Sequence, residues 1–541
     1  MTHIPSASRP LLTAHRAGAE ISARAAAQAD RAAGVLLGHA AGDALGVPYE
    51  FATLAADQPH TPQMLGGGLG NYRPGEWSDD TQMSMCVARA AARARLDDQD
   101  PLVGPNLDEV AGAFVAWQQW GPPDIGNQTS AVLAAAARFE AERDRARTGT
   151  AQSVTEAARA HAQRTGHAAG NGAVMRTESI ALAFLHDRHA AAAAAARVAR
   201  LTHHDPLAVA SCVLVVDAIR RAVLTGVLDV HAGLDLLDTA DRDAWTHHLD
   251  VAVEERPDRF TPNGFTVTAV QAAVSAIVHT PVPAQTPAAH LVDALGTAIR
   301  IGDDTDTVAA IAGGMLGAVW GASAVPWRLR RLIHGWAGAP ASTSGVPLRE
   351  RDLISLATDL TDGPEARNAV TRRQTVPYGE PRSVAVPHPY DAGVLLGTSN
   401  CEAPGADAVV SLCRVGTNEP AFAHMAPADR VEVRLIDSDA AGDNANLEFV
   451  LADAAVAVAQ LRSEGRTVLL HCVAAQQRTP SVAVAYARLL GHDPDVVAAA
   501  VSSALHRSVR GHGHVWDTAR SPELGASLDR LDREAGRPRP T

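Results

Sequence analysis

Two clusters of acidic and hydroxyl side chains, each directly before an apolar helical run, are the residues of this sequence best suited to chemistry. The first is "SDDT", Ser78 to Thr81, and the second is "GDDTDT", Gly302 to Thr307. Acidic residues at a helix start complement the helix dipole, so capping alone accounts for either cluster considered by itself. The same oxygens are also ligands that hard cations such as Mg²⁺ or Mn²⁺ prefer. Helix capping and metal binding therefore both remain open for each cluster.

The amount of negative charge favours a metal if the two clusters meet. They lie more than two hundred residues apart, and neither has a Cys or His at ligand spacing. Several carboxylates sharing one cleft would repel one another strongly unless cations neutralised them, and a pair of ions suits that much charge. The hypothesis depends on the chain folding back to bring together Ser78, Asp79, Asp80, Asp304, Asp306 and Thr307.

Three further motifs add candidate binding residues. "GHAAGDALGVPYEF" places Gly42, Asp43, Gly46 and Glu50 around the end of a helix. "GNGAVMR" is a Gly/Asn loop entering a helix, where backbone N–H groups are suited to phosphate or ribose oxygens. "LTHHDPLA" carries His203 before a helix that begins with proline. Each motif is weak alone, because a glycine-rich turn is usually only a turn and a loop histidine is usually solvated.

Taken together and in this order, the five motifs resemble the ADP-ribosylglycohydrolase family, of the dinitrogenase-reductase-activating and ADP-ribosylarginine-hydrolase type. The resemblance covers nearly all of residues 31–340. It implies an all-α fold with two Mg²⁺ or Mn²⁺ ions. It also implies an enzyme that removes ADP-ribose from a modified protein side chain or from a small molecule.

The resemblance implies a role for each motif. The two metal-ligand sets are Ser78, Asp79 and Asp80, and Asp304, Asp306 and Thr307. The loop residues Gly170, Asn171 and Gly172 would cradle the diphosphate and the distal ribose, which His203 would also contact. Glu50 resembles a glutamate that gates or assists the metal site, and either Asp79 or Asp80 is also a candidate base. Asp303 stands where many relatives have glycine, and no role is predicted for it.

A second constellation lies near the C-terminus, where "VLLHCVAAQQRTPSV" separates Cys472 from Arg478 by five residues. With five cysteines and 47 arginines in 541 residues, about 0.4 Cys–Arg pairs at this spacing are expected by chance. The spacing alone is therefore weak evidence for a site. An apolar strand leads into the cysteine and a helix beginning at Thr479-Pro480 leads out. A strand–loop–helix of this kind directs N–H groups at an anion and lowers the pKa of a thiol at the helix start.

This segment resembles the signature loop of dual-specificity, cysteine-based phosphatases, over roughly residues 385–525. The resemblance implies that Cys472 is the nucleophile, that Arg478 binds the phosphate and that Thr479 assists turnover. Asp437 is the first candidate for the general acid and Asp439 the second. Ala475 and Gln477 depart from the family's usual Gly and Ser, so a loop that binds phosphate without hydrolysing it remains an alternative, as does a structural cysteine.

The elements that must position these residues divide the chain into a multidomain protein. We predict an N-terminal extension over 1–30, an all-α ADP-ribosylglycohydrolase-like domain over 31–362, a linker over 363–384 and a smaller α/β, dual-specificity-phosphatase-like domain over 385–536. Alanine-rich amphipathic segments, such as 130–145 and 207–224, fill the first domain. Short apolar runs alternating with helical stretches fill the second.

Composition limits where this protein works and what it binds. The 541 residues carry a net charge of −13, which argues against coating nucleic acid and leaves local basic patches open. Five scattered cysteines without a CxxC pair favour a reducing cytoplasm, and no signal-peptide core is recognised. The uncharged stretch 307–327 has the length of a membrane span, but its Ala/Gly content and acidic flank favour a buried helix.

Three functional hypotheses follow. The first is a bifunctional enzyme that acts on an ADP-ribosylated protein or small molecule and has a second, phosphatase-like module with a phosphorylated substrate. The second is an ADP-ribosyl hydrolase whose C-terminal domain senses a phosphorylated ligand without catalysis. The third is a phosphatase joined to a non-enzymatic glycohydrolase-like domain. The retained acidic clusters argue against the third, because a disused metal site should lose its repelling carboxylates.

Overall fold

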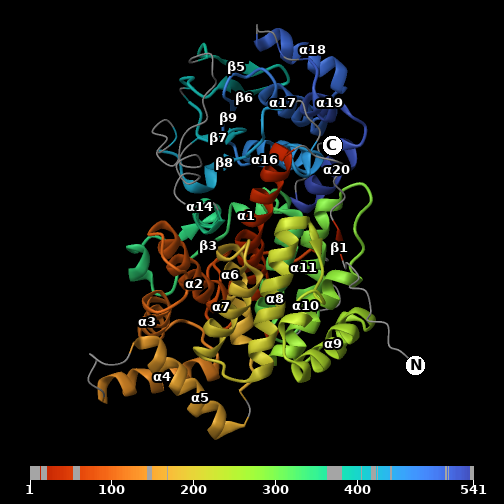
Figure 1. Cartoon of the computed structure of the whole chain (residues 1–541). Coiled ribbons are helices and arrows are strands. Elements are labelled where there is room, and N and C mark those ends of the chain that lie inside the picture. Colours follow the sequence, from red (N-terminus) through yellow and green to blue (C-terminus); the bar gives the residue numbers. More distant parts are fainter. Residues whose placement is uncertain are drawn as a thin grey trace.

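The chain folds into a large helical part followed by a smaller α/β part, as the change of sequence texture near residue 380 predicts (Figure 1). The computed structural model describes residues 12–13, 21–52, 61–142, 149–166, 168–361, 381–403, 405–415, 422, 424–438, 442–505, 509 and 511–536. Most of the predicted N-terminal extension and of the predicted linker, together with Asp439, lies outside these ranges.

Helices build almost all of the first part, and the amphipathic segments predicted from sequence form helices there. In chain order they are α1 (Ile21–Gly46), α2 (Asp79–Leu96), α3 (Pro105–Trp120), α4 (Asn127–Glu142), α5 (Thr150–Thr165), α6 (Glu178–Ala183), α7 (Arg188–Arg200), α8 (Pro206–Thr225), α9 (Thr239–Glu254), α10 (Thr266–His279), α11 (His290–Arg300), α12 (Thr305–Trp320), α13 (Trp327–Arg330) and α14 (Glu350–Thr361). Two small antiparallel pairs of strands join distant segments: β1 (Leu12–Thr13) with β2 (Val227–Leu228), and β3 (His334–Gly335) with β4 (Leu348–Arg349).

Helices α1 and α12 form the centre of this part and approach each other closely because glycines line their contact. Gly34 and Gly38 of α1 lie against Gly317 and Gly313 of α12. A Cβ atom on Gly317 would stand 1.8 Å from the carbonyl oxygen of Gly34, so only glycine fits there. Every residue of α12 is buried, which confirms the interpretation of this stretch as a buried helix.

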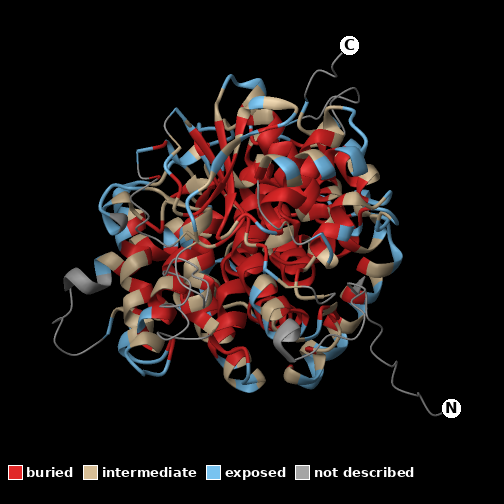
Figure 2. Ribbon diagram, turned by 90° about the horizontal axis from the view of Figure 1, so that it is seen from above, coloured by how far each residue is buried: buried red, intermediate tan, exposed pale blue. Residues whose placement is uncertain are grey.

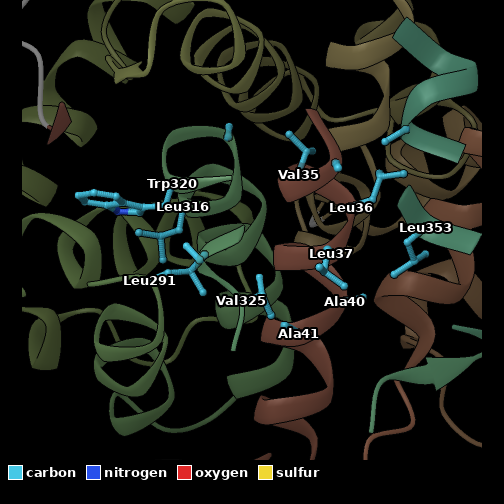
Figure 3. Packing of buried hydrophobic residues seen from close by; sticks show 14 of the residues in the cluster. Val35, Leu36, Leu37, Ala40, Ala41, Leu291, Leu316, Trp320, Val325 and Leu353 are labelled. Carbon is cyan, nitrogen blue, oxygen red and sulfur yellow. The ribbon is translucent and has the colours of Figure 1, made fainter. Parts of the chain in front are cut away.

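The core of the helical part surrounds α1 on several sides. Figure 3 shows side chains of α1, among them Leu37 and Ala41, between a group from α11 and α12 and, on the other side, Leu353 of α14. Viewed from above, the buried residues fill the interior and the exposed ones gather on outer loops and helix faces (Figure 2). All five cysteines are among the described residues, are buried and form no disulfide with one another. Among the described residues, no helix combines the length and apolar character that crossing a bilayer requires.

The second part is a five-stranded sheet flanked by helices. The strands are β5 (Ala385–His388), β6 (Asp391–Thr398), β7 (Ala408–Ser411), β8 (Arg430–Glu432) and β9 (Val468–Cys472), and the helices are α16 (Leu447–Ser463), α17 (Arg478–Leu489), α18 (Pro494–Leu505), α19 (His514–Arg520) and α20 (Leu524–Glu534). The strand order is β5-β6-β9-β7-β8; β5 runs antiparallel to β6, and the other neighbours pair in parallel. Ligands of such sheets bind outside the carboxyl ends of the strands, and β9, the buried central strand, ends at Cys472.

Polar contacts join the two parts. The Asp453 carboxylate on α16 accepts hydrogen bonds from the backbone N–H of Trp327, 2.9 Å to each oxygen, and from Arg330, 3.2 Å away. Arg331 forms an ion pair with Glu464 at 2.5 Å. The Asp453–Arg330 pair is the more buried of the two, and removing one of its partners would leave a charge without compensation at the junction.

Candidate active site

The first acidic cluster is held in place by a carboxylate from another helix. Asp43, fully buried in the last turns of α1, accepts from the backbone N–H and the hydroxyl of Ser78, both at 2.8 Å, through one oxygen. Its other oxygen accepts from the N–H and the hydroxyl of Thr81, at 3.0 and 2.6 Å. Asp43 thereby caps the first turn of α2 and orients Asp79 and Asp80. The sequence drew attention to Asp43 only as part of a motif. Its signal is that it is the one carboxylate in the second half of α1, residues 32–46, which is apolar apart from His39.

The second cluster starts α12 and meets Glu50, which follows α1 and a short 3₁₀ turn (Val47–Tyr49). Carboxylate oxygens of Glu50, Asp304 and Asp306 all lie within 4.8 Å of one another. The Thr305 hydroxyl donates to the carbonyl of Gly46 at 2.9 Å and so ties the start of α12 to the end of α1. Asp303 has a left-handed backbone with φ of 58°, which is consistent with glycine at this position in relatives.

The two clusters face each other in one buried site. Burial raises the pKa of Asp306, and the charges of Asp80 and Glu50 raise it further. Burial, followed by the charges of Asp43 and Asp79, likewise raises the pKa of Asp80 well above its usual range. The structure thus brings "SDDT" and "GDDTDT" together, although they are far apart in sequence.

The donor set of this site fits divalent cations. Asp79, Asp80 and Asp306 are each less than a tenth exposed, yet no positively charged side chain among the described residues forms an ion pair with them. One oxygen of Asp80, Oδ1, is buried without a hydrogen-bond partner among the described residues. Uncompensated buried carboxylates are costly, and oxygen-only donors suit Mg²⁺ or Mn²⁺. The carboxylates proposed from sequence therefore lie in one site, and their binding of a metal stays a prediction.

The glycine loop lies beside this site. The Asn171 amide Nδ2 donates to Asp304 Oδ2 at 2.7 Å, which links the loop directly to the second cluster. A Cβ on Gly172 would stand 3.1 Å from Cε1 of His203, so glycine keeps space open between loop and ring. His203 is buried, and its Nδ1 is 2.8 Å from the Thr202 hydroxyl. Burial and the nearby Arg176 hold the pKa of His203 well below its usual range, which keeps the ring neutral.

Two further residues belong to the site and were not predicted. Asn263, fully buried, accepts from the backbone N–H of Asp304 at 2.9 Å and donates to the carbonyl of Gly302 at 3.0 Å, so it shapes the loop that carries the second cluster. Asp124 follows α3, and its charge raises the pKa of both Glu50 and Asp79. Neither residue stands in a recognisable motif, because each reaches the site through tertiary packing alone.

The carboxyl groups predict a specific dependence of stability on pH. Burial and the charges of Asp124 and Asp304 raise the pKa of Glu50 from 4.5 to about 8. A carboxyl group with a raised pKa holds its proton more tightly in the folded than in the unfolded chain, so its contribution to stability is lost as pH rises through that window. We therefore expect the melting temperature of EDTA-treated protein to fall between pH 5 and about 8. Saturating Mg²⁺ or Mn²⁺ should remove most of the decline.

Melting curves of wild type and Glu50→Gln across this range measure the effect. The variant lacks one titrating group and should show a shallower decline in EDTA. An identical slope in the two proteins, or a melting temperature that rises over this range in EDTA, would show that the pKa of Glu50 is not raised in the folded protein.

The second constellation gathers at the carboxyl end of β9. Cys472 is almost fully buried there, and Arg478 begins α17. Arg478 Nη1 donates to the carbonyls of Leu412 and Leu435, at 3.1 and 2.9 Å, and Nη2 lies 3.3 Å from the Asp437 carboxylate. A phosphate entering this loop would therefore compete with Asp437 for Nη2.

The remaining loop residues bear on the phosphatase hypothesis in different ways. Ala475 has φ of 53°, so this position does adopt the left-handed backbone for which the phosphatases' glycine is suited, and alanine carries a cost of roughly 1 kcal/mol there. The Thr479 hydroxyl donates to the carbonyl of Gly397 at 3.4 Å. The candidate nucleophile, arginine and general acid thus lie near the carboxyl ends of the parallel strands. The identity of this part as a phosphatase stays a prediction.

Comparisons with known proteins concern the helical part. The family model described as ADP-ribosylglycohydrolase matches residues 24–369. ADP-ribosylarginine hydrolase Tri1 of Pseudomonas putida is 27% identical over 318 residues, which cover 55% of this chain and 72% of that protein. ADP-ribosyl-[dinitrogen reductase] glycohydrolase of Rhodospirillum rubrum is 29% identical over 301 residues, with 55% and 88% covered. A solved ADP-ribosylglycohydrolase-related protein complex aligns with a TM-score of 0.45 at 24% identity, over 62% of this chain and 98% of the other. The matched residues include both acidic clusters and the glycine loop, and the chain belongs to the ADP-ribosylglycohydrolase family.

Proposed function

We propose that the helical part is a divalent-metal-dependent hydrolase that removes ADP-ribose from arginine side chains of modified proteins. Family membership supports the glycohydrolase reaction, and the two similar enzymes named above act on ADP-ribosylarginine and on ADP-ribosylated dinitrogen reductase. The observation that carries the proposal is the meeting of two acidic clusters beside the glycine loop, with Asn171 bonded to Asp304.

The residues around the site suggest a division of labour. Gly170 and Gly172 leave room for the diphosphate and distal ribose, and the neutral ring of His203 lines the same space. Asn171 connects that binding loop to the second cluster. Two Mg²⁺ or Mn²⁺ ions would be held by Ser78, Asp79, Asp80, Asp304, Asp306 and Thr307. Glu50 would assist them, since its carboxylate lies within 4.8 Å of those of Asp304 and Asp306. When bound, the ions would neutralise these carboxylates and polarise water and ribose hydroxyls.

Hydrolysis replaces the bond between ribose C1′ and the arginine nitrogen by a bond from C1′ to a water oxygen. One of the water protons goes to a carboxylate, and the departing guanidine nitrogen takes up a proton. Asp79 and Asp80 are both candidates for that base, and the choice between them stays open. The rest of the site positions the ribose and excludes bulk water, since Asp80, Asp306 and His203 are almost fully buried.

The test is a panel of ADP-ribosylated substrates assayed with and without EDTA. We expect release of ADP-ribose from arginine-linked substrate, loss of that release in EDTA and recovery when Mg²⁺ or Mn²⁺ is added in excess. Faster turnover of a serine-linked or other O-linked substrate would move the assignment to another linkage. If no substrate turned over with either metal, the enzymatic proposal would be wrong.

The α/β part has a second candidate function, a cysteine-dependent phosphatase. The grouping of Cys472, Arg478 and Asp437 at the carboxyl end of β9 favours it. In the proposed reaction the Cys472 thiolate attacks phosphorus and Asp437 gives a proton to the leaving oxygen. Water then hydrolyses the phosphocysteine to free thiolate and phosphate. Arg478 would bind the phosphate oxygens throughout.

Hydrolysis of para-nitrophenyl phosphate separates catalysis from sensing. We expect activity in the wild type, none in Cys472→Ser, and wild-type activity in Cys401→Ser, which changes another buried free cysteine of the same part. If the wild type does not hydrolyse the compound but phosphate still raises its melting temperature, the loop is a phosphate sensor.

A further inference from the structure

A cleft of about 780 Å³ lies at the junction of the helical and α/β parts. Residues between Trp327 and Ile354 line one side of it, and residues between Val409 and Arg434, including β7 and β8, line the other. It contains none of the residues assigned above to either constellation. Its volume is that of typical cofactor and nucleotide sites.

The cleft is positively charged in an acidic protein. The chain carries a net charge of −13, yet six arginines and only three acids line this cleft: Arg330, Arg331, Arg349, Arg351, Arg430 and Arg434, with Glu350, Asp352 and Glu432. Some of the arginines have structural partners. Four of them form ion pairs: Arg330 with Glu350 at 2.6 Å, Arg331 with Glu464 at 2.5 Å, and both Arg351 and Arg434 with Glu432, at 3.3 and 3.5 Å.

Three arginines face one another across the junction. Arg349 and Arg351 come from β4 and the start of α14, and Arg430 begins β8. All three residues line the same cleft, and the charges of Arg351 and Arg349 add to burial in lowering the pKa of Arg430. Neither Arg349 nor Arg430 forms an ion pair within the described part of the chain. An anion bound between them would relieve this repulsion.

The rest of the lining is apolar. Val346 is about two-thirds exposed, and Ile354, Val409 and Phe422 also line the cleft, although each is less than a tenth exposed. Guanidinium groups match phosphate oxygens in geometry, and apolar or aromatic side chains suit a base or a sugar face. A ligand that satisfies both halves carries adjacent phosphates and an aromatic ring.

We propose that this cleft binds a nucleoside diphosphate, with its phosphates on Arg349, Arg351 and Arg430 and its base against the apolar wall. Such a ligand would contact both parts of the chain at once. The wall formed by β7 and β8 continues into Leu412 and Leu435, whose carbonyls accept from Arg478. The bound nucleotide would therefore stabilise the junction and the backbone that positions the Cys472 loop.

Photolabelling of the full chain with 8-azido-ADP tests where the nucleotide binds. We expect covalent label within 346–354 or 409–434, mapped by mass spectrometry. Labelling should fall at least about tenfold in Arg349→Ala/Arg430→Ala, the expected size for loss of charged hydrogen bonds. Arg256→Ala, which removes a surface arginine paired with Asp258, should label as the wild type does. Arg256→Ala should keep the wild-type melting temperature. The double variant should keep or exceed it, because it removes repulsion between arginines.

Competition identifies what is recognised. Unlabelled ADP should protect the cleft best, pyrophosphate more weakly and adenosine least. Equal protection by pyrophosphate and ADP would refute recognition of the nucleoside. Label confined to the helical part around the glycine loop, or label in the cleft that persists in the double variant, would overturn the proposal without touching the hydrolase assignment.

Discussion

Replacement of Asp306 by asparagine should strongly reduce hydrolysis of ADP-ribosylated substrate while making the metal-free protein more stable. Asp306 is almost fully buried, and Asp80, Glu50 and Asp304 all face it. Asparagine keeps the oxygen that accepts from the N–H of Thr307 at 3.0 Å but removes the negative charge. We expect activity to fall by on the order of 10²–10³-fold, as when a charge-stabilising group is removed from an active site.

The same variant should melt about 2 °C or more above the wild type in EDTA, because one repelling charge is gone. With saturating Mg²⁺ or Mn²⁺ the order should reverse, since the wild type gains more from the metal. Asp250→Asn, at an exposed position on α9, serves as the control and should change neither quantity much. An Asp306→Asn protein that is less stable in EDTA would show that the carboxylate is a helix cap rather than a metal ligand.

Gly317→Ala is expected to destabilise the protein more than the addition of a single methyl group usually does. The added Cβ would lie 1.8 Å from the carbonyl oxygen of Gly34, and the contact is between two backbones that no side-chain rotation can relieve. Helices α1 and α12 would have to separate, and both carry residues of the candidate active site, Asp43 on α1 and Asp306 on α12. The expected loss is more than about 3 kcal/mol, the upper range for overpacked cores.

Gly314→Ala provides a control on the same helix. Its Cβ would meet Glu178 Cβ at 3.4 Å, an ordinary contact. Alanine is favoured over glycine in a helix by roughly 1 kcal/mol, so this variant should match or exceed the wild type in stability. Urea unfolding followed by circular dichroism compares the two. Similar midpoints for Gly317→Ala and the wild type would mean that the helices are not packed as closely as described.

Local sequence predicted most of the elements that carry the site. Acidic residues before an apolar run indicated where α2 and α12 begin, and helical periodicity or short apolar runs located most of the other elements of both parts. The apolar run 430–437 forms a strand only as far as Glu432, and the N–H of Val433 still donates to the carbonyl of Ser411 at 2.7 Å. These signals are local, and their physical basis is backbone propensity and amphipathic pattern.

Tertiary structure alone decided which groups meet. The sequence named the two acidic clusters, but only the close packing of α1 against α12 brings them together and makes Asp43 the residue that orients the first. Asn263 and Asp124 reach the site from loops with no motif, and Arg349 and Arg430 share a cleft because the two parts dock across it. Such contacts join residues far apart in the chain, and they depend on how side chains fill space rather than on any local pattern.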